Sequence, residues 1–139
     1  MSQDDFPAPQ AGFVVTHFLV VSNQDRSREF YRSVFGARVL LERDPVILRL
    51  ANCWLILNVG GGPTDDKPTV TLATPADPDQ TSVFLNLRVA DIAAAYAGWS
   101  AKGAEFLTEP KHHAGEIRAC IRDPDGHLIE VGHSTVGRG

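Results

Sequence analysis

Short segments in which apolar and polar residues alternate recur along the chain, and this pattern predicts β-strands. In the first half we expect strands at about 15–21, 37–43, 45–50 and 53–59. In the second half we expect them at about 83–89, 104–108, 115–122 and 127–133. Because successive side chains of a strand point to opposite faces, each segment presents one face to a core and one away from it.

One helix is predicted in each half, directly after its first strand. The first begins at a capping residue, Ser22 or Asn23, and ends at Gly36. The second begins at Asp91 and ends at Gly103. Apolar residues fall on one face of each helix, namely Phe30, Tyr31 and Val34 in the first and Ile92, Ala95, Tyr96 and Trp99 in the second. Both helices are therefore expected to pack against a sheet.

The two halves repeat the same order of elements. The segment "GARVL" at 36–40 returns as "GAEFL" at 103–107, each time directly after the helix. Each half then reads strand, helix, strand, strand, strand, and a repeat of roughly 55 residues is too long for one step of a solenoid. The predicted fold class is α+β, with two matched βαβββ modules.

The expected organisation is a single domain at 13–134 between two tails, 1–12 and 135–139. Within it, module one is 13–59, a connector is 60–81 and module two is 82–134. The connector is rich in proline and glycine, which disfavour a long helix or a central strand. The first residues are acidic and lack an apolar stretch, so we expect a loose tail and no signal peptide.

Composition excludes several classes of function. The formal net charge is −4, and the 13 basic residues are spread along the chain, so no nucleic-acid surface is expected. No apolar run approaches the roughly 20 residues that span a bilayer, so no membrane role is expected either. The two cysteines, Cys53 and Cys120, have no metal-ligand spacing and suit a reducing compartment, which predicts a cytoplasmic protein.

Three segments carry a resemblance to a known family. They are "SREFYRSVFGA" at 27–37, "VADIAAAYAGWSAKGAEF" at 89–106 and "RDPDGHLIEV" at 122–131. With the paired βαβββ units, they resemble the vicinal oxygen chelate superfamily, which includes glyoxalase I, bleomycin-resistance proteins, fosfomycin-resistance enzymes and extradiol dioxygenases. The resemblance covers roughly residues 13 to 134. It implies that each module curls into a half-barrel with helices outside and a ligand pocket inside, and that two copies form a homodimer.

The resemblance also implies a divalent metal held by the first and last strands of the modules. Glu130 falls at the last-strand metal position, and strand parity places it on the pocket side, opposite Ile129 and Val131. The first-strand histidine position falls on Thr16. His17 lies one residue off and needs a β-bulge to reach the pocket. The remaining ligand positions hold Phe84 and Ile56.

Parity indicates which other side chains line the pocket. We expect these side chains to bind a flat, partly polar organic molecule. The set consists of Phe18, Trp54, Ile56, Phe84, Asn86, Arg88 and Arg118. The same parity places Val59 and Val83 on the dry, helix-facing side. Arg88 is an alternative partner for Glu130, because an ion pair between them satisfies the carboxylate without a metal.

Four further histidines lie in the second half. His112 and His113 precede the strand at 115–122 in a predicted loop that is free to swing over a pocket mouth. His127 and His133 flank the last strand on the face opposite Glu130, where we expect them near solvent.

Two functions stay open at this point. The first is a glyoxalase-like lyase or dioxygenase, in which a metal acts as a Lewis acid, Glu130 is ligand or catalytic base, and His17 is recruited as a second ligand. The second is a metal-free protein of the bleomycin-resistance type, which binds a small molecule without chemistry.

Overall fold

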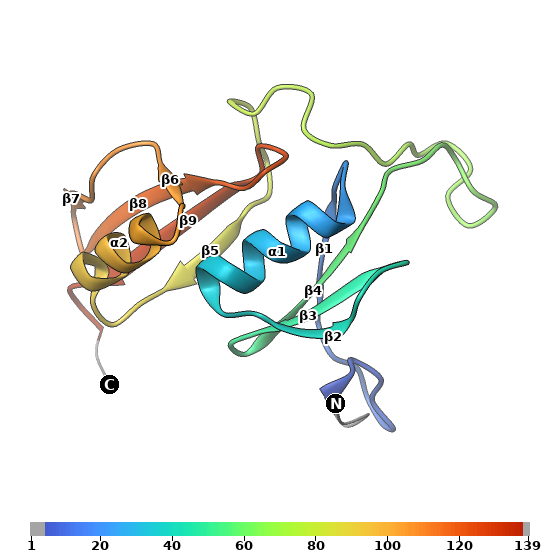
Figure 1. The fold of residues 1–139 in the computed structure, drawn as a ribbon, viewed down its shortest axis with the longest axis horizontal. Helices are drawn as coiled ribbons and strands as arrows, with labels where there is room; N and C mark the ends of the chain where they lie inside the picture. The colour runs from blue at the N-terminus through green and yellow to red at the C-terminus, as the bar shows by residue number, and fades with distance from the viewer. Residues whose placement is uncertain (1–4, 138–139) are drawn as a thin grey trace. The chain divides into compact units, whose positions relative to one another are not determined.

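The computed structural model describes residues 5–137 and contains two compact units, Met1–Thr74 and Pro75–Gly139. The division lies within the predicted connector. Each unit has its own sheet and its own helix, in the element order drawn in Figure 1. No helix among residues 5–137 has the length and apolar character needed to cross a bilayer.

The first unit contains the predicted βαβββ order. Its elements are β1 (His17–Val20), α1 (Gln24–Phe35), β2 (Arg38–Leu41), β3 (Val46–Leu50) and β4 (Cys53–Asn58). The strands form a four-stranded sheet in the order β1-β4-β3-β2. β1 runs parallel to β4, and the other pairs are antiparallel. A parallel neighbour for β1 requires a crossover, and α1 lies within it.

Local residues set the limits of α1 as the sequence predicts. The side chain of Asn23 accepts a hydrogen bond from the backbone N–H of Arg26 at 3.0 Å, so Asn23 is the N-cap. At the other end Gly36 adopts a left-handed φ of 74°, and its N–H donates to the carbonyl of Arg32. Glycine takes this φ without a Cβ penalty, which makes it a favourable residue to end a helix.

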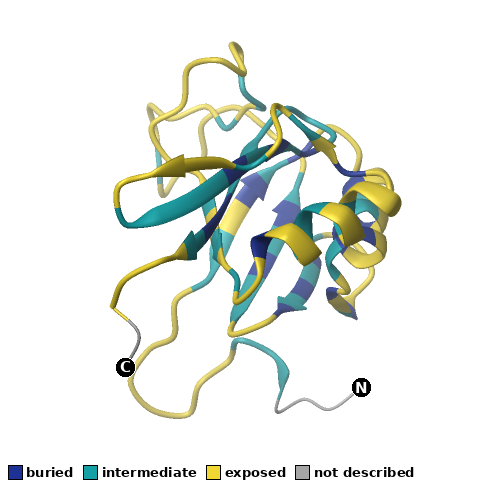
Figure 2. Cartoon of the chain, turned by 90° about the vertical axis from the view of Figure 1, so that its left-hand side faces the viewer, coloured by how far each residue is buried: buried dark blue, intermediate teal, exposed yellow. Residues whose placement is uncertain are grey.

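The core of the first unit lies between α1 and one face of the sheet. The side chains of this core are almost completely buried. They belong to Leu19, Val21, Tyr31, Val34, Val46, Leu48, Leu55 and Leu57. Figure 2 shows buried positions alternating with half-buried ones along the strands, while the helices keep exposed outer surfaces. The parity prediction holds for this face, except that Val59 is 50% exposed because β4 ends one residue before it.

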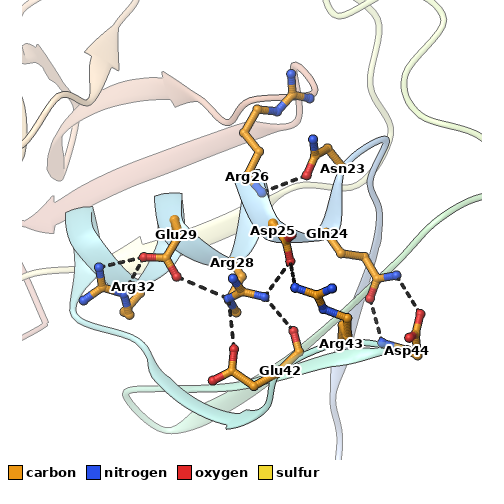
Figure 3. Close-up of polar contacts among 10 residues, drawn as sticks. All are labelled: Asn23, Gln24, Asp25, Arg26, Arg28, Glu29, Arg32, Glu42, Arg43 and Asp44. Carbon is orange, nitrogen blue, oxygen red and sulfur yellow. Dashed lines mark hydrogen bonds and ion pairs between the residues drawn. The ribbon is translucent and has the colours of Figure 1, made fainter.

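A buried arginine connects α1 to Glu42, the residue that directly follows β2 (Figure 3). Arg28 donates to the carboxylate of Asp25 at 2.8 Å and to the carbonyl of Glu42 at 2.9 Å. It also pairs with Glu29 at 3.2 Å. Burial alone lowers the pKa of Arg28, but the hydrogen bonds that it donates to Asp25 and Glu29 outweigh this effect and raise the pKa above its ordinary value. The guanidinium therefore stays charged while its stem is covered.

The second unit repeats the order with one additional strand. Its elements are β5 (Leu85–Arg88), α2 (Ile92–Ala101), β6 (Glu105–Phe106), β7 (Lys111–His113), β8 (Glu116–Arg122) and β9 (Leu128–Ser134). The sheet order is β5-β9-β8-β6, and β7 also pairs with β8. β5 is parallel to β9, so the module has the same crossover as the first. The predicted α+β fold of two βαβββ modules is confirmed.

The core of the second unit lies under α2. Ala119, Ile121, Ile129 and Val131 of the sheet are 3% exposed or less, and Ile92 of the helix is 4% exposed. The predicted cap at Asp91 is confirmed, since its side chain accepts from the N–H of Ala94 at 3.1 Å. Val83 departs from the prediction because it precedes β5 and is 70% exposed.

Two predictions about histidines in this unit are wrong. His112 and His113 do not lie in a loop, because they form β7, which continues β8 through an antiparallel hairpin. His133 is half-buried and does not point freely into solvent, because its Nδ1 accepts the N–H of Ile92 at 3.1 Å. That bond satisfies one of the donors that every helix leaves unpaired in its first turn. His127 is also half-buried.

Candidate functional site

The polar residues of the second unit gather on the face of its sheet that lies away from α2, called here the helix-free face. Strand register arranges them in rows across β5, β9 and β8. One row is Asn86, Glu130 and Cys120, the next is Arg88, Gly132 and Arg118, and the third is Ser134 and Glu116. Direct neighbours in such rows lie about 5 Å apart at Cβ, within reach of one another's side chains.

Glu130 is held by an amide in this structure. Asn86 Nδ2 donates to Glu130 Oε1 at 2.7 Å, between neighbouring residues of β5 and β9. On the other side lies Cys120, half-buried in β8. Burial raises the pKa of the Cys120 thiol, and the charge of Glu130 raises it further. The alternative ion pair between Glu130 and Arg88 does not form.

Arg88 instead reaches across β9 to β8. Its Nη1 donates to Glu116 Oε1 at 3.0 Å, and its Nη2 donates to Ser134 Oγ at 2.9 Å. Glu116 also pairs with Arg118 at 3.4 Å, so a single carboxylate lies between two guanidinium groups. The side chains of Arg88 and Arg118 are 46% and 40% exposed, so both stay accessible to a ligand.

This ion-pair cluster predicts a measurable pH dependence. The hydrogen bond from Arg88 lowers the pKa of Glu116 below its ordinary value of 4.5, against an opposing effect of burial. Because the folded pKa is depressed, the stabilisation is present above pH 4.5 and is lost as the pH falls through the folded pKa. We expect the unfolding free energy, measured by urea titration, to decrease less steeply with falling pH below 4.5 in Glu116→Gln than in the wild type. Exposed Glu105→Gln is the matched control, and equal slopes in the two variants would contradict the assignment.

The first unit has its own helix-free face. Phe18 and Ile56 are direct neighbours on β1 and β4, and Phe18 is 47% exposed. Arg49 of β3 lies over the ring of Trp54, with 4.2 Å between its Cζ and the ring centroid. Trp54 Nε1 donates to the carbonyl of Asp5 at 2.6 Å. The predicted loose tail therefore has an exception at Asp5, whose carboxylate also pairs with Arg38 at 2.9 Å.

Three of the four residues at the metal positions do not fit a metal, and Glu130 is the exception. β1 pairs with β4 in uninterrupted register from His17–Leu55 to Val20–Asn58, so the bulge that His17 needs is not formed. His17 therefore shares the helix-facing side with Leu19. Phe84 and Ile56 carry no donor atom in their side chains, and Thr16 offers only a hydroxyl. Within residues 5–137, no three or more His, Cys, Asp or Glu side chains gather closely enough to hold an ion, whereas a defined metal site normally uses three or more protein ligands.

The remaining predicted binding residues lie as follows. Asn86, Arg88 and Arg118 share the helix-free face of the second unit with Glu130, whereas Phe18, Trp54 and Ile56 belong to the first unit. Phe84 directly precedes β5 and is 41% exposed. Sequence reasoning missed Ser134 as a partner of Arg88. Its only signal was its position four residues after Glu130, which gives it the same strand parity.

Comparisons with known proteins agree with this fold. The chain is 29% identical over 119 residues to the metallothiol transferase FosB of Shouchella clausii, which covers 84% of this chain and 76% of that protein. The structure of TioX from Micromonospora sp. ML1 superposes with a TM-score of 0.67 at 22% identity, covering 88% of this chain and 99% of that one. TnmS3, an antibiotic binding protein from Streptomyces sp. CB03234, gives 0.65 at 20% identity, covering 92% of this chain and 100% of that one.

The model of one protein family matches most of the chain. The match runs over residues 13–131, which includes every strand of both sheets up to Val131 of β9. It agrees with the two sheet modules of the fold, each with one helix. The chain therefore belongs to the Glyoxalase/Bleomycin resistance protein/Dioxygenase superfamily.

Proposed function

We propose that this protein binds a small organic molecule on the helix-free face of the second-unit sheet, without a resident metal ion. The observation that carries the proposal is the state of Glu130. Its neighbours on that face are an amide, a thiol and two guanidinium groups, and its carboxylate already accepts a hydrogen bond from Asn86. These groups orient a polar ligand, but they are not the ligand set of a divalent ion.

Accessible hydrogen-bonding groups support this proposal. Arg88, Arg118 and Asn86 offer N–H donors, while Glu130 and Glu116 offer acceptors, all within three rows of one sheet. Such a surface suits an oxygen-rich or aromatic compound with both donors and acceptors. The similarity to TnmS3, described as an antibiotic binding protein, is consistent with a binding role for the same fold.

A metal-dependent enzyme is the second candidate, as a transferase, a glyoxalase-like lyase or a dioxygenase. It is favoured by the similarity to metallothiol transferase FosB and by the resemblance, which implies that the last-strand metal position falls on Glu130. Under this candidate Glu130 is a metal ligand, and the ion supplies Lewis acidity to a bound substrate. Fold alone does not decide between the two, because this fold class carries several unrelated activities.

Metal content and metal affinity separate the two candidates. Under our proposal, protein purified without chelators contains substoichiometric zinc, manganese, nickel and iron, and Glu130→Gln does not change that content. The glutamine keeps an oxygen that accepts from Asn86, so the variant is expected to fold normally. The measurements are elemental analysis and calorimetric titration with each ion. Stoichiometric metal in the wild type that is lost in Glu130→Gln would show a metal site at Glu130, as the enzyme candidate requires, and would overturn our proposal.

Three other expectations stay predictions. They are the two-fold homodimer, the cytoplasmic location, and the division into modules at 13–59 and 82–134 around the connector. The binding role of Phe18, Trp54, Ile56 and Phe84 also belongs to the proposal. Of these, Trp54 already has Arg49 over one face of its ring and donates its Nε1–H to Asp5, so a ligand that stacks on that face has to displace Arg49.

A further inference from the structure

Gly132 has a specific relation to Arg88. The two residues are direct neighbours on β9 and β5, and Gly132 is buried. A Cβ built at position 132 would overlap Nη1 of Arg88, and would lie 2.6 Å from its Cζ and 3.2 Å from its Nη2. These distances place the methyl position above the plane of the guanidinium and not at its edge. The guanidinium therefore lies flat on the backbone of β9, in the space that a side chain would fill.

Two hydrogen bonds hold the group in this orientation. Nη1 donates to Glu116 on β8, and Nη2 donates to Ser134, farther along β9. These acceptors lie at the edge of the guanidinium, so they fix the direction of its plane as well as its position. One face of the plane is against Gly132. With 46% of the side chain exposed, the opposite face is what Arg88 presents to a ligand.

We propose that Arg88 is a stacking platform for a planar, electron-rich ring, and that Gly132 is the residue that determines this specificity. This inference rests on the proposed function and names its ligand class. A flat guanidinium attracts the face of an aromatic ring through its charge and its π-system. With Glu116 and Ser134 already accepting from both of its Nη atoms, Arg88 has less capacity to bind a free anion edge-on. Glu116 also partly neutralises its charge.

The row beside Arg88 fits the same ligand class. Asn86 and Glu130 lie one row away on the same face and already form a hydrogen bond at 2.7 Å. An unused Glu130 oxygen accepts from a phenolic or amine donor at the rim of a ring that stacks on Arg88. An aromatic compound with a hydroxyl substituent therefore satisfies both rows at once.

The test compares the affinities of three matched probes for isotope-labelled protein. Binding is measured in NMR titrations from the chemical-shift changes of backbone amides and arginine side chains. Naphthol is planar and aromatic, decalinol is its fully hydrogenated, non-planar analogue, and cyclohexanecarboxylate is a non-planar anion. We expect the wild type to bind naphthol about tenfold more tightly than decalinol, the ratio that one well-formed cation–π contact supplies. Cyclohexanecarboxylate should bind more weakly than naphthol.

Two variants remove the platform in different ways. Gly132→Ala displaces the guanidinium from β9, and Arg88→Lys keeps the charge but removes the planar group. Both should reduce the preference for naphthol over decalinol to about threefold or less, since no planar guanidinium then lies in place to stack on the ring and a Lys ammonium gives only a weaker contact. Gly98→Ala in α2 is the matched control, because a Cβ there meets nothing within 4 Å, and it should keep the wild-type preference. If Gly132→Ala fails to fold, Arg88→Lys alone decides the result.

The possible failures are distinguishable. Equal binding of naphthol and decalinol by the wild type overturns the stacking inference and leaves the proposed function intact. An unchanged preference in Arg88→Lys does the same. Absence of any shift on the helix-free face with all three probes overturns the proposed function together with this inference.

Discussion

Leu57→Asp is expected to prevent folding. Leu57 lies in the middle of the first sheet, 0% exposed, with Leu19 and Val46 as its direct neighbours on either side. Removing a buried leucine side chain costs about 2–5 kcal/mol, and placing a carboxyl group in the same apolar space adds several more. Together these exceed about 5 kcal/mol, which is comparable with the whole stability of a typical domain. The expected far-ultraviolet circular dichroism spectrum is that of an unfolded chain.

Ile56→Asp is the matched control, one residue away on the same strand. Ile56 points to the helix-free face beside Phe18 and is only half-covered. Its replacement is expected to cost roughly 1–2 kcal/mol, because the new carboxylate keeps contact with water. Urea titrations should give a cooperative transition for Ile56→Asp and none for Leu57→Asp. Similar transitions in both variants would show that the two faces of β4 are assigned wrongly.

Local signals in the sequence were sufficient for the order and limits of the helices. Asn23 and Asp91 both cap, and Gly36 takes the left-handed φ that ends α1, because these effects depend only on a few neighbouring residues. Strand parity likewise assigned Glu130 and Ile129 to opposite faces correctly, since the period of two is a property of the single strand. The fold class followed from these elements and their repetition.

The partners of the polar residues could not be predicted in the same way. Parity placed Arg88 and Glu130 on one face, but it does not say which residues are opposite each other across strands. β9 lies between β5 and β8, and the register sets Glu130 opposite Asn86 and Gly132 opposite Arg88. The side chain of Arg88 therefore passes over Gly132 to donate to Glu116, and Glu130 accepts from Asn86 instead. Such information depends on the assembled sheet.

Strand ends were the other source of error. Val59 and Val83 continue the apolar alternation of β4 and β5, yet both lie outside the paired segments and are exposed. Alternation persists in sequence beyond the point where a neighbouring strand stops. The reverse occurs at His112 in β7, where polar residues form a strand because β8 offers an unpaired edge.

Arg28→Met is expected to destabilise the protein by about 1–3 kcal/mol, because it removes charge-assisted hydrogen bonds from a covered position. The side chain of Arg28 is 11% exposed and holds Asp25 of α1 together with the carbonyl of Glu42 (Figure 3). Methionine keeps most of the apolar stem, so the loss reports the guanidinium and not the packing. The partner carboxylates are partly exposed and recover water, which keeps the cost below that of a fully buried pair. Thermal and urea unfolding measure the change.

Arg32→Met is the control for Arg28→Met, four residues later in the same helix. Arg32 also pairs with Glu29, at 2.7 Å, but its side chain is 53% exposed. Exposed pairs of this kind add little to stability because water and salt screen them. Arg32→Met should therefore unfold close to the wild-type midpoint, while Arg28→Met unfolds at clearly lower urea and temperature. If both variants lose the same stability, the connection from α1 to Glu42 has no special role, and Arg28 behaves as one more surface charge.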